Sequence, residues 1–263
     1  MTVAGIDIGA GTAKAVILRD GEIISYSIMP VTGDVTKVVE EVTGEALEKA
    51  GFSLRNLDYV VSTGYGRNAV SFANKATTEI ICHASGVHFL IPQARTIIDI
   101  GAQDSKVIRV NERGEVTDFV MNDKCAAGTG RFLEVMAQVL GVKLEEMGPM
   151  SLNSKNLCNI SSTCTVFAES EVVSLRAQGK SIEDLIAGIH RAIASRVVIM
   201  GSGIKFEKET VFTGGVAKNS GVERALEEVG GVEILIPMEP QITGALGAAL
   251  RAEAECKKHS PGN

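Results

Sequence analysis

Cys125 lies a few residues upstream of a predicted helix. Four apolar side chains recur behind it at helical spacing and give that helix one apolar face: Phe132, Met136, Val139 and Leu140. Thr129 fits the N-cap, and Gly141 fits the position just past the C-terminus. The small residues between Cys125 and the helix leave backbone N–H groups uncovered. We therefore expect the thiol to face a positive helix end, where its pKa falls and an anionic ligand is favoured.

Cys164 has the same setting in a second segment. It stands at the head of a predicted helix that ends at Gly179, and three residues before it are possible caps: Ser161, Ser162 and Thr163. The two cysteines are 164 − 125 = 39 residues apart. An iron–sulfur cluster usually takes about four thiolates, so one chain offers half of the ligands and a homodimer would complete them. Burial is the commoner fate of a free cysteine. Cys82 fits it, and Cys256 lies in a charged tail. Cys158, six residues before Cys164, could be a spare ligand, but burial is favoured for it as well.

Length and composition set the outer limits. With 263 residues, 45% hydrophobic and 22% charged, the chain is an ordinary globular protein that is long enough for two domains. A net charge of −6 argues against a broad nucleic-acid surface. The sequence shows neither a long apolar run nor a basic-then-apolar leader, which indicates a cytoplasmic protein that does not enter the membrane. Five irregularly spaced cysteines do not match a secreted disulfide framework.

The N-terminal residues predict a strand, a glycine turn, a second strand, an Asp20-Gly21 turn and a third strand. The same pattern returns 99 − 7 = 92 residues later, where Ile98-Asp99-Ile100-Gly101-Ala102 matches Ile6-Asp7-Ile8-Gly9-Ala10 and Lys106 matches Lys14. The repeat predicts two related halves, each opening with a strand–turn–strand whose glycine turn faces the cleft between them. The turns fit neither the Rossmann nor the P-loop motif.

The rest of the chain predicts alternating helices and strands. We expect helices over 34–50, in the stretch that reaches Pro92, over 182–200, up to Val229 and from Thr243, and strands at 58–63, 210–213 and 232–236. Residues 1–92 are predicted to form the first half and residues 93–263 the second half with the cysteine segments. The last helix, 243–257, is a segment that can pack back on the first half.

Two glycine turns that each follow an aspartate fit a triphosphate. The backbone N–H groups of Gly9, Ala10, Gly11 and Thr12 and those of Gly101, Ala102, Gln103 and Asp104 can bind phosphate oxygens. Asp7 and Asp99 can hold Mg²⁺ through water, and Thr12 and Lys14 would contact phosphate. Gln103 or Asp104 would orient the attacking water. The simpler interpretation is a pair of tight turns with solvated lysines. The matched pair, together with the Gly214-Gly215 turn, favours the nucleotide.

These motifs resemble the fold shared by actin, sugar kinases and acetate kinase. The resemblance implies an α/β protein with two duplicated actin-like ATPase halves around a nucleotide cleft, binding ATP or ADP with Mg²⁺. It also implies that the third glycine motif contacts adenosine through four residues: Gly214, Gly215, Val216 and Asn219. Two further residues, Gly244 and Ala245, would lie in the wall beside these contacts.

A closer resemblance covers nearly the whole chain. GIDIGAGTAK, DIGAQDSK, NDKCAAGTGRFLE, CTVFAESEVVS and FTGGVAKN look like the ATP-dependent activators (component A) of 2-hydroxyacyl-CoA dehydratases. That family implies a homodimer with one 4Fe-4S cluster on its two-fold axis, ligated by Cys125 and Cys164 of each subunit. It further implies that ATP hydrolysis drives one low-potential electron from a flavodoxin or ferredoxin into a dehydratase component, under anaerobic conditions.

Three other functions fit parts of the sequence. A small-molecule kinase of the same fold would share the phosphate turns, but it would have no use for two cysteines at helix heads. A non-catalytic ATP-binding scaffold would turn nucleotide over slowly. An activator of another acyl-CoA system, such as benzoyl-CoA reduction, or of a double-cluster reductase shares most of the same motifs.

Overall fold

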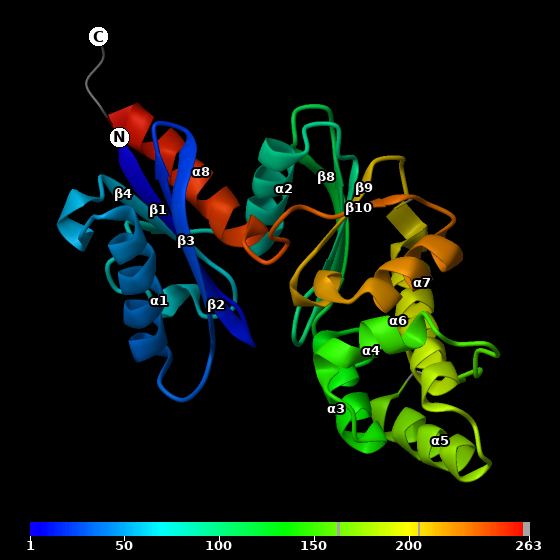
Figure 1. Cartoon of the computed structure of the whole chain (residues 1–263). Helices are drawn as coiled ribbons and strands as arrows, with labels where there is room; N and C mark the ends of the chain where they lie inside the picture. The colour runs from blue at the N-terminus through cyan, green and yellow to red at the C-terminus, as the bar shows by residue number, and fades with distance from the viewer. Residues whose placement is uncertain (162–163, 205, 260–263) are drawn as a thin grey trace. The chain divides into compact units, whose positions relative to one another are not determined.

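The computed structural model describes residues 1–161, 164–204 and 206–259 (Figure 1). The chain forms two compact units. Unit 1 comprises Met1–Ala94, Val110–Thr117 and Pro237–Asn263, and unit 2 comprises Arg95–Arg109 and Asp118–Ile236. The C-terminal segment thus belongs with the N-terminal residues, whereas unit 2 is built almost entirely from the middle of the chain.

Unit 1 is built on a five-stranded sheet in the order β3-β2-β1-β4-β5. Its strands are β1 (Thr2–Ile8), β2 (Thr12–Arg19), β3 (Glu22–Pro30), β4 (Tyr59–Thr63) and β5 (Lys75–Ala76). β1 pairs antiparallel with β2 and parallel with β4. The predicted β2–β3 turn is confirmed: Asp20 and Gly21 have φ of 52° and 82°, as a tight hairpin turn requires. The two-residue strand β5 was not predicted.

Helices cover the sheet of unit 1. They are α1 (Val35–Ala50), α2 (Glu79–Leu90) and α8 (Thr243–His259), with short 3₁₀ turns η1 (Leu54–Asn56) and η2 (Arg67–Ala69). The predicted ends of α1 are confirmed, since Asp34 accepts a hydrogen bond from the Thr36 N–H and Gly51 has φ 72°. α8 packs on β1, β4 and β2, and α2 packs on α8. The approach to β1 is so close that a Cβ at Gly5 would collide with the α8 backbone.

Unit 2 repeats the strand order. Its sheet runs β10-β9-β6-β7-β8, and its strands are β6 (Thr96–Ile100), β7 (Ser105–Val110), β8 (Val116–Asn122), β9 (Thr210–Thr213) and β10 (Ile234–Leu235). Asp99 pairs with Lys106 across β6 and β7 as Asp7 pairs with Lys14 across β1 and β2. The predicted 92-residue repeat is therefore confirmed down to the strand register. β10 is shorter than the predicted strand over 232–236.

The helices of unit 2 share one apolar core with the sheet. They are α3 (Gly130–Leu140), α4 (Leu144–Ser151), α5 (Thr165–Ala177), α6 (Ile182–Gly201) and α7 (Ser220–Gly230), with 3₁₀ turns η3 (Ser202–Ile204) and η4 (Gly215–Lys218). The segment Ile182–Ile204 is long and apolar enough to cross a membrane, but 56% of its most apolar window is buried. α6 packs against α7 and α4, so it is the core helix of this unit.

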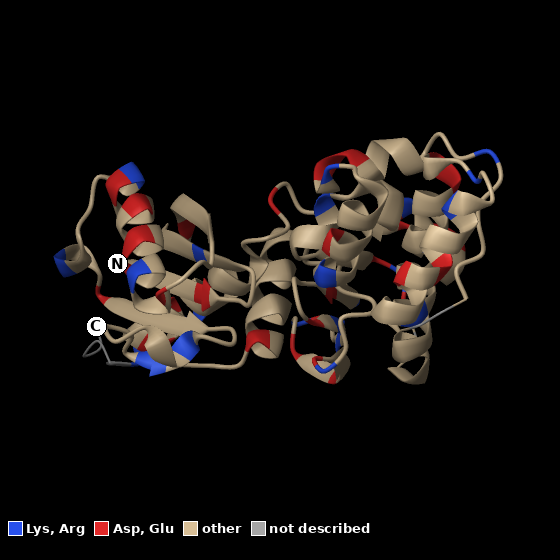
Figure 2. Cartoon of the chain, turned by 90° about the horizontal axis from the view of Figure 1, so that it is seen from below, with Lys and Arg blue, Asp and Glu red and all other residues tan. Residues whose placement is uncertain are grey.

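Charged residues of both signs are interspersed along the chain (Figure 2). Many form exposed pairs one helical turn apart, such as Lys49 with Glu45 on α1 and Arg224 with Glu228 on α7. Exposed pairs of this kind contribute at most about 1 kcal/mol to stability. The charges that bear on chemistry are the buried ones at the ends of β1 and β6.

Candidate functional site

The end of β1 holds a carboxylate beside a tight turn. Asp7 is 5% exposed, and its Oδ2 lies 3.3 Å from Lys14 Nζ on β2. The Gly9 N–H donates to the Thr12 carbonyl at 3.0 Å, which closes the turn. All four predicted turn residues, 9–12, are partly exposed. Unit 1 thus presents a carboxylate, a lysine and an accessible backbone turn within a few residues, as the phosphate hypothesis requires.

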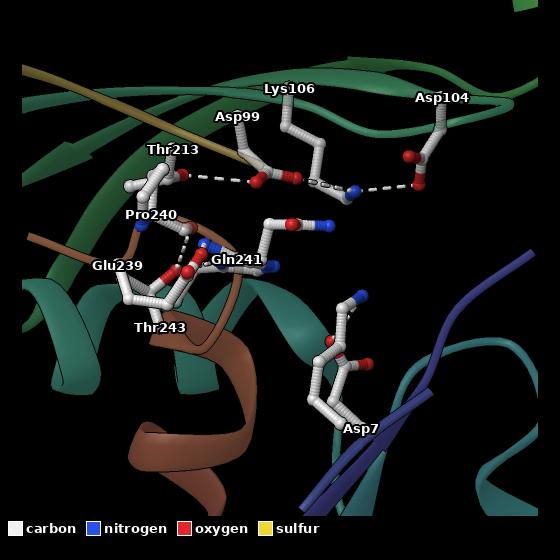
Figure 3. Close-up of polar contacts among 11 residues, drawn as sticks. Asp7, Asp99, Asp104, Lys106, Thr213, Glu239, Pro240, Gln241 and Thr243 are labelled. Carbon is white, nitrogen blue, oxygen red and sulfur yellow. Dashed lines mark hydrogen bonds and ion pairs between the residues drawn. The ribbon is translucent and has the colours of Figure 1, made fainter. Parts of the chain in front are cut away.

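The end of β6 carries a tighter cluster (Figure 3). Lys106 Nζ lies 3.1 Å from Asp99 Oδ2 and 2.6 Å from Asp104 Oδ2. The Thr213 hydroxyl on β9 donates to Asp99 Oδ1 at 3.0 Å. All of these side chains are nearly fully buried. The simpler interpretation, in which the lysines of both turns are solvated, is therefore wrong for Lys106.

The same cluster separates the two candidates for orienting water. Asp104 is buried and its carboxylate is paired with Lys106, because the side chain folds back over the turn. Gln103 is exposed at the tip of the turn. An exposed amide can reach a water without breaking a buried ion pair, so the geometry favours Gln103.

The third glycine motif begins directly beside Asp99. Gly214 has φ 86°, and a Cβ there would collide with the Ile100 carbonyl and lie 3.0 Å from Asp99 Oδ1. Val216 is buried in the core of unit 2. Asn219 caps α7, accepting from the Gly221 and Val222 N–H groups at 3.0 and 3.1 Å. The side chains of Val216 and Asn219 are thus already used by the fold.

A buried histidine supports that cap. His190 Nε2 lies 3.3 Å from Asn219 Nδ2. Burial lowers the pKa of His190 to about 3, so the ring is neutral at physiological pH. A neutral ring can accept from the amide, and this fixes which way the Asn219 amide points.

The two residues predicted for the adenosine wall lie in the first turn of α8. A Cβ at Gly244 would lie 3.0 Å from Asp7 Oδ2 and 3.3 Å from His83 Cε1, and Ala245 is fully buried. The structure therefore brings Gly244 to the Asp7 carboxylate within unit 1. His83 is held in place by Thr243, whose Oγ1 lies 3.0 Å from the ring Nδ1.

Sequence reasoning predicted Gly214 as an adenosine contact, but it missed that a threonine–glycine pair stands beside each aspartate, at the ends of β4 and β9. Thr63 stands in register with Asp7, and Thr213 stands in register with Asp99. The following glycines have φ of 84° and 86°, and a Cβ on either would meet the neighbouring aspartate. A short apolar strand ending in Thr-Gly in each half was the available signal.

The Cys125 segment differs from its prediction. The first N–H groups of α3 are not uncovered: Gly130 N–H donates to the Gly101 carbonyl and Arg131 N–H to the Ala102 carbonyl, both at 2.8 Å. Thr129 is the N-cap by position, but its hydroxyl donates to the Ala126 carbonyl instead of capping the helix. The start of the cysteine helix is therefore bonded directly to the glycine turn after Asp99.

Cys164 matches its prediction more closely. It is exposed, stands at the N-cap of α5 and accepts the Ala168 N–H at 2.9 Å through its carbonyl. Ser161 is not a cap, since its N–H and hydroxyl donate to the Glu171 carboxylate. Ser162 and Thr163, the other two predicted caps, lie outside the described residues. α5 ends at Ala177, two residues before the predicted end at Gly179.

The cysteines sort into two classes. Cys82 and Cys158 are buried as predicted, and burial raises the pKa of Cys82 to about 12. Cys125 is partly exposed and Cys164 is exposed, and both belong to unit 2. Within the described residues, three His, Cys, Asp or Glu side chains never gather as a metal site. Cys256 is also partly exposed, but it belongs to unit 1. The two accessible thiols of unit 2 fit a cluster whose other ligands come from a second copy.

Comparisons with known proteins give one consistent result. Residues 4–252 match the model of the BadF/BadG/BcrA/BcrD ATPase family. The chain is 48% identical to the 2-hydroxyisocaproyl-CoA dehydratase activator of Clostridioides difficile, over 98% of this chain and 97% of that protein. It is also 48% identical to the activator of lactoyl-CoA dehydratase of Anaerotignum propionicum, over 98% and 100% of the two chains. One of the subunits of the benzoyl-CoA reductase of Thauera aromatica is 35% identical, over 95% and 93%.

Solved structures agree with the sequence matches. The Clostridium difficile activator of 2-hydroxyisocaproyl-CoA dehydratase, solved with bound ADPNP, superposes with a TM-score of 0.93 at 47% identity, covering 98% of this chain and 96% of that one. Component A of the Acidaminococcus fermentans (R)-2-hydroxyglutaryl-CoA dehydratase gives 0.95 at 46%, covering 98% and 99%. A ROK-family glucokinase from Streptomyces griseus, at 13% identity and a TM-score of 0.60 over 97% and 100%, shares the fold alone. The predicted two-lobed, actin-like α/β fold is thereby confirmed.

Proposed function

Because the chain belongs to the BadF/BadG/BcrA/BcrD ATPase family, we propose that it is an ATP-hydrolysing activator of a 2-hydroxyacyl-CoA dehydratase. Two relatives named as dehydratase activators are each 48% identical to this chain over nearly its full length. A kinase of the same fold is supported only at the level of fold. The activator proposal accounts for both the nucleotide turns and the two accessible cysteines of unit 2.

In this proposal each unit contributes its own residues to ATP. In unit 1, Lys14, Thr12 and the N–H groups of Gly9–Thr12 bind phosphate oxygens, with Asp7 holding the hydrated Mg²⁺. In unit 2, Asp99 holds the metal's water shell and Gln103 orients the attacking water. The backbone of residues 214–219 binds the adenosine.

The observation that carries the proposal is the pair of hydrogen bonds from α3 to the Asp99 turn. The Gly101 and Ala102 carbonyls hold the first N–H groups of the helix that follows Cys125. A shift of this turn when the γ-phosphate leaves would move the start of α3, because both bonds are short and direct. Nucleotide state and the thiol segment are thus mechanically linked within one unit.

We further propose that Cys125 and Cys164 of two copies hold one 4Fe-4S cluster in a homodimer. When bound, such a cluster supplies one-electron transfer at a low potential. The protein's part is to present two accessible thiols, keep Cys82 and Cys158 buried, and place Cys164 at the positive end of α5. A dehydratase component would accept the electron, and a flavodoxin or ferredoxin would supply it, in an anaerobic cytoplasm.

The cluster is tested on protein purified under nitrogen. Iron, acid-labile sulfide and mass in solution are measured for the wild type, Cys125→Ser, Cys164→Ser and the control Cys256→Ser, which changes a partly exposed cysteine of unit 1. About four irons per dimer are expected for the wild type and the control, with none retained by the other two variants. Equal iron content in all four proteins would remove the cluster assignment.

The client enzyme is tested separately by activation. The activator with its iron–sulfur cluster assembled, ATP and a chemical reductant are added to a purified 2-hydroxyacyl-CoA dehydratase component. In parallel, the same mixture is added to a benzoyl-CoA reductase. Dehydration of the hydroxyacyl thioester that depends on ATP is expected in the first reaction. Activity in the second reaction alone would instead make this chain an activator of benzoyl-CoA reduction. That function is the second candidate because a subunit of a benzoyl-CoA reductase is 35% identical to this chain.

A further inference from the structure

Unit 2 contains a cavity of about 690 Å³ that the nucleotide and thiol proposals do not use. One wall is the stretch 121–128 around Cys125, a second is the stretch 158–161 upstream of Cys164, and the third is the part of α6 from Gly188 to Met200. None of the residues proposed to contact ATP is among its lining residues. The cavity is therefore separate from the proposed ATP contacts, and two of its three walls are the cysteine segments.

Positive charge is concentrated in this cavity. Lys124, Arg191 and Arg196 line it, with Asp123 as the one carboxylate residue among the described lining. The chain as a whole carries a net charge of −6, so this local surplus runs against the protein's average. A recess lined by charge of one sign raises the local concentration of oppositely charged ligands. The expected ligand is an anion.

Arg196 carries an unsatisfied hydrogen-bond donor in this cavity. Its Nε is buried and has no hydrogen-bond partner among the described residues. A buried donor that stays unsatisfied costs about 1–3 kcal/mol. The planar guanidinium fork matches a carboxylate or phosphate with two parallel hydrogen bonds. An oxyanion in the cavity would supply the partner that the fold itself does not.

The remaining lining is mostly apolar, with four polar side chains: Asn122, Asn159, Ser161 and Ser195. Phe132, Ile160 and Ile193 form part of the wall, and Ile199 at the rim is 72% exposed. Small-molecule sites typically have volumes of about 300–1,000 Å³ and apolar walls with a few polar groups that fix orientation. A bare inorganic ion would leave the apolar walls without a partner.

We propose that this cavity binds a small organic anion, a carboxylate or phosphate monoester on an apolar group, with Arg196 as its principal ligand. Lys124 and Arg191 add charge at the entrance, where both are exposed. Binding by itself does not depend on the proposed ATPase or cluster function, because it rests on side chains that neither of them uses.

Binding is coupled to the loop that carries Cys125. Gly128 has φ 85°, and a Cβ there would lie 3.2 Å from Arg196 Cδ and 3.5 Å from its Cγ, so the arginine stem lies against the loop. A ligand that fixes the guanidinium fixes this stem. Because linkage is reciprocal, any event that moves the loop changes the affinity for the anion by the same factor.

The binding test uses the full chain purified anaerobically and three probes in calorimetric titrations. Hexanoate carries both the anion and the apolar group, acetate carries the anion alone, and hexanol carries the apolar group alone. Hexanoate is expected to bind the wild type at least about tenfold more tightly than either control probe. Hexyl phosphate then decides whether the site prefers a phosphate monoester to a carboxylate.

Variants test whether hexanoate binds at Arg196. Arg196→Gln is expected to weaken hexanoate binding by at least about tenfold, Arg196→Lys by less, and Arg224→Gln, which changes an exposed ion-paired arginine on α7, not at all. No binding by the wild type, equal binding by Arg196→Gln, or hexanol binding as tightly as hexanoate would overturn the proposal.

Hydrogen–deuterium exchange tests the coupling. Hexanoate is expected to slow exchange across residues 122–131 in the wild type, to have no effect there in Arg196→Gln, and to leave α1 of unit 1 unchanged. Binding without a change in this segment would remove the coupling. The iron measurement described above tests the cluster independently, so failure of one assignment is distinguishable from failure of the other.

Discussion

In unit 1, Lys14 faces one carboxylate at 3.3 Å, whereas in unit 2 the equivalent Lys106 lies between two, at 3.1 and 2.6 Å. The strand register is the same in both hairpins. The difference comes from one position in the turn, since Asp104 corresponds to Thr12 (104 − 92 = 12). At this position unit 2 has a carboxylate, which gives its lysine a second buried partner.

This comparison shows that duplication preserved the backbone and allowed the chemistry to diverge. Lys14 can turn to a phosphate by giving up one contact, and its side chain is 12% exposed. Lys106 is 3% exposed and would have to give up two contacts. The first hairpin is thus suited to contact the ligand. The second is suited to hold Asp99 in a fixed position and to anchor α3.

The largest expected difference is in stability after loss of each lysine. Lys106→Met leaves two buried carboxylates without their cation and should lower the free energy of unfolding by about 3–5 kcal/mol. Lys14→Met should cost about 1.5–3 kcal/mol, since one less buried contact is lost. Urea unfolding followed by circular dichroism measures both values. An equal or larger cost for Lys14→Met would contradict the difference drawn between the hairpins.

Substitution of the two aspartates asks whether both hairpins serve the metal. Asp7→Asn and Asp99→Asn keep the shape of the side chain and remove its charge. Each is expected to lower the Mg²⁺-dependent kcat of ATP hydrolysis by about 10²–10³-fold, as when a positioned electrostatic group is lost. The iron content should stay at the wild-type value. An unchanged ATPase rate in either variant would remove that hairpin from the catalytic site.

The glycines behind the aspartates should behave alike. Gly64→Ala and Gly214→Ala each force a side chain into φ near +85° and against an aspartate, which costs about 1–3 kcal/mol from backbone strain. Thermal unfolding should therefore shift by a similar amount in both variants. A large loss in only one of them would show that the duplicated Thr-Gly ends of β4 and β9 do not have equivalent roles.

The smallest effect is expected at the residue that makes the hairpins differ. Asp104→Asn can still accept from Lys106 and relieves the surplus negative charge, so stability should change by less than about 1 kcal/mol. ATP hydrolysis should fall by less than about tenfold, which corresponds to about 1.4 kcal/mol. Gln103→Ala should reduce it more. Loss of hydrolysis in a stably folded Asp104→Asn protein would instead make Asp104 the residue that orients water.

Local patterns were enough to predict most of the framework. The hairpins followed from apolar strands around glycine turns, and α1, α3 and α7 end close to their predicted residues because each has a glycine in the left-handed region just past it. α4 was missed, since it contains Pro149 and starts after Lys143 rather than after a usual capping residue.

The site was harder to predict because its contacts join distant residues. The Gly101 carbonyl that takes the Gly130 N–H is 130 − 101 = 29 residues away, and no spacing rule connects them. For that reason the start of α3 was assigned to the thiol and not to the glycine turn. The pairing of Asp104 with Lys106 could have been predicted from the sequence, since residues two apart near a strand lie on one face.

The packing of α8 on β1 also bears on the order in which the two units can fold during synthesis. Synthesis releases β1 to β4 first, but the apolar face that they share with α8 stays without its partner until residues 243–259 leave the ribosome. Almost all of unit 2 emerges earlier and as a nearly unbroken segment. Domains generally fold as they emerge, the N-terminal one first. We therefore expect unit 2 to complete its core before unit 1, because the sheet of unit 1 needs α8 to cover this face.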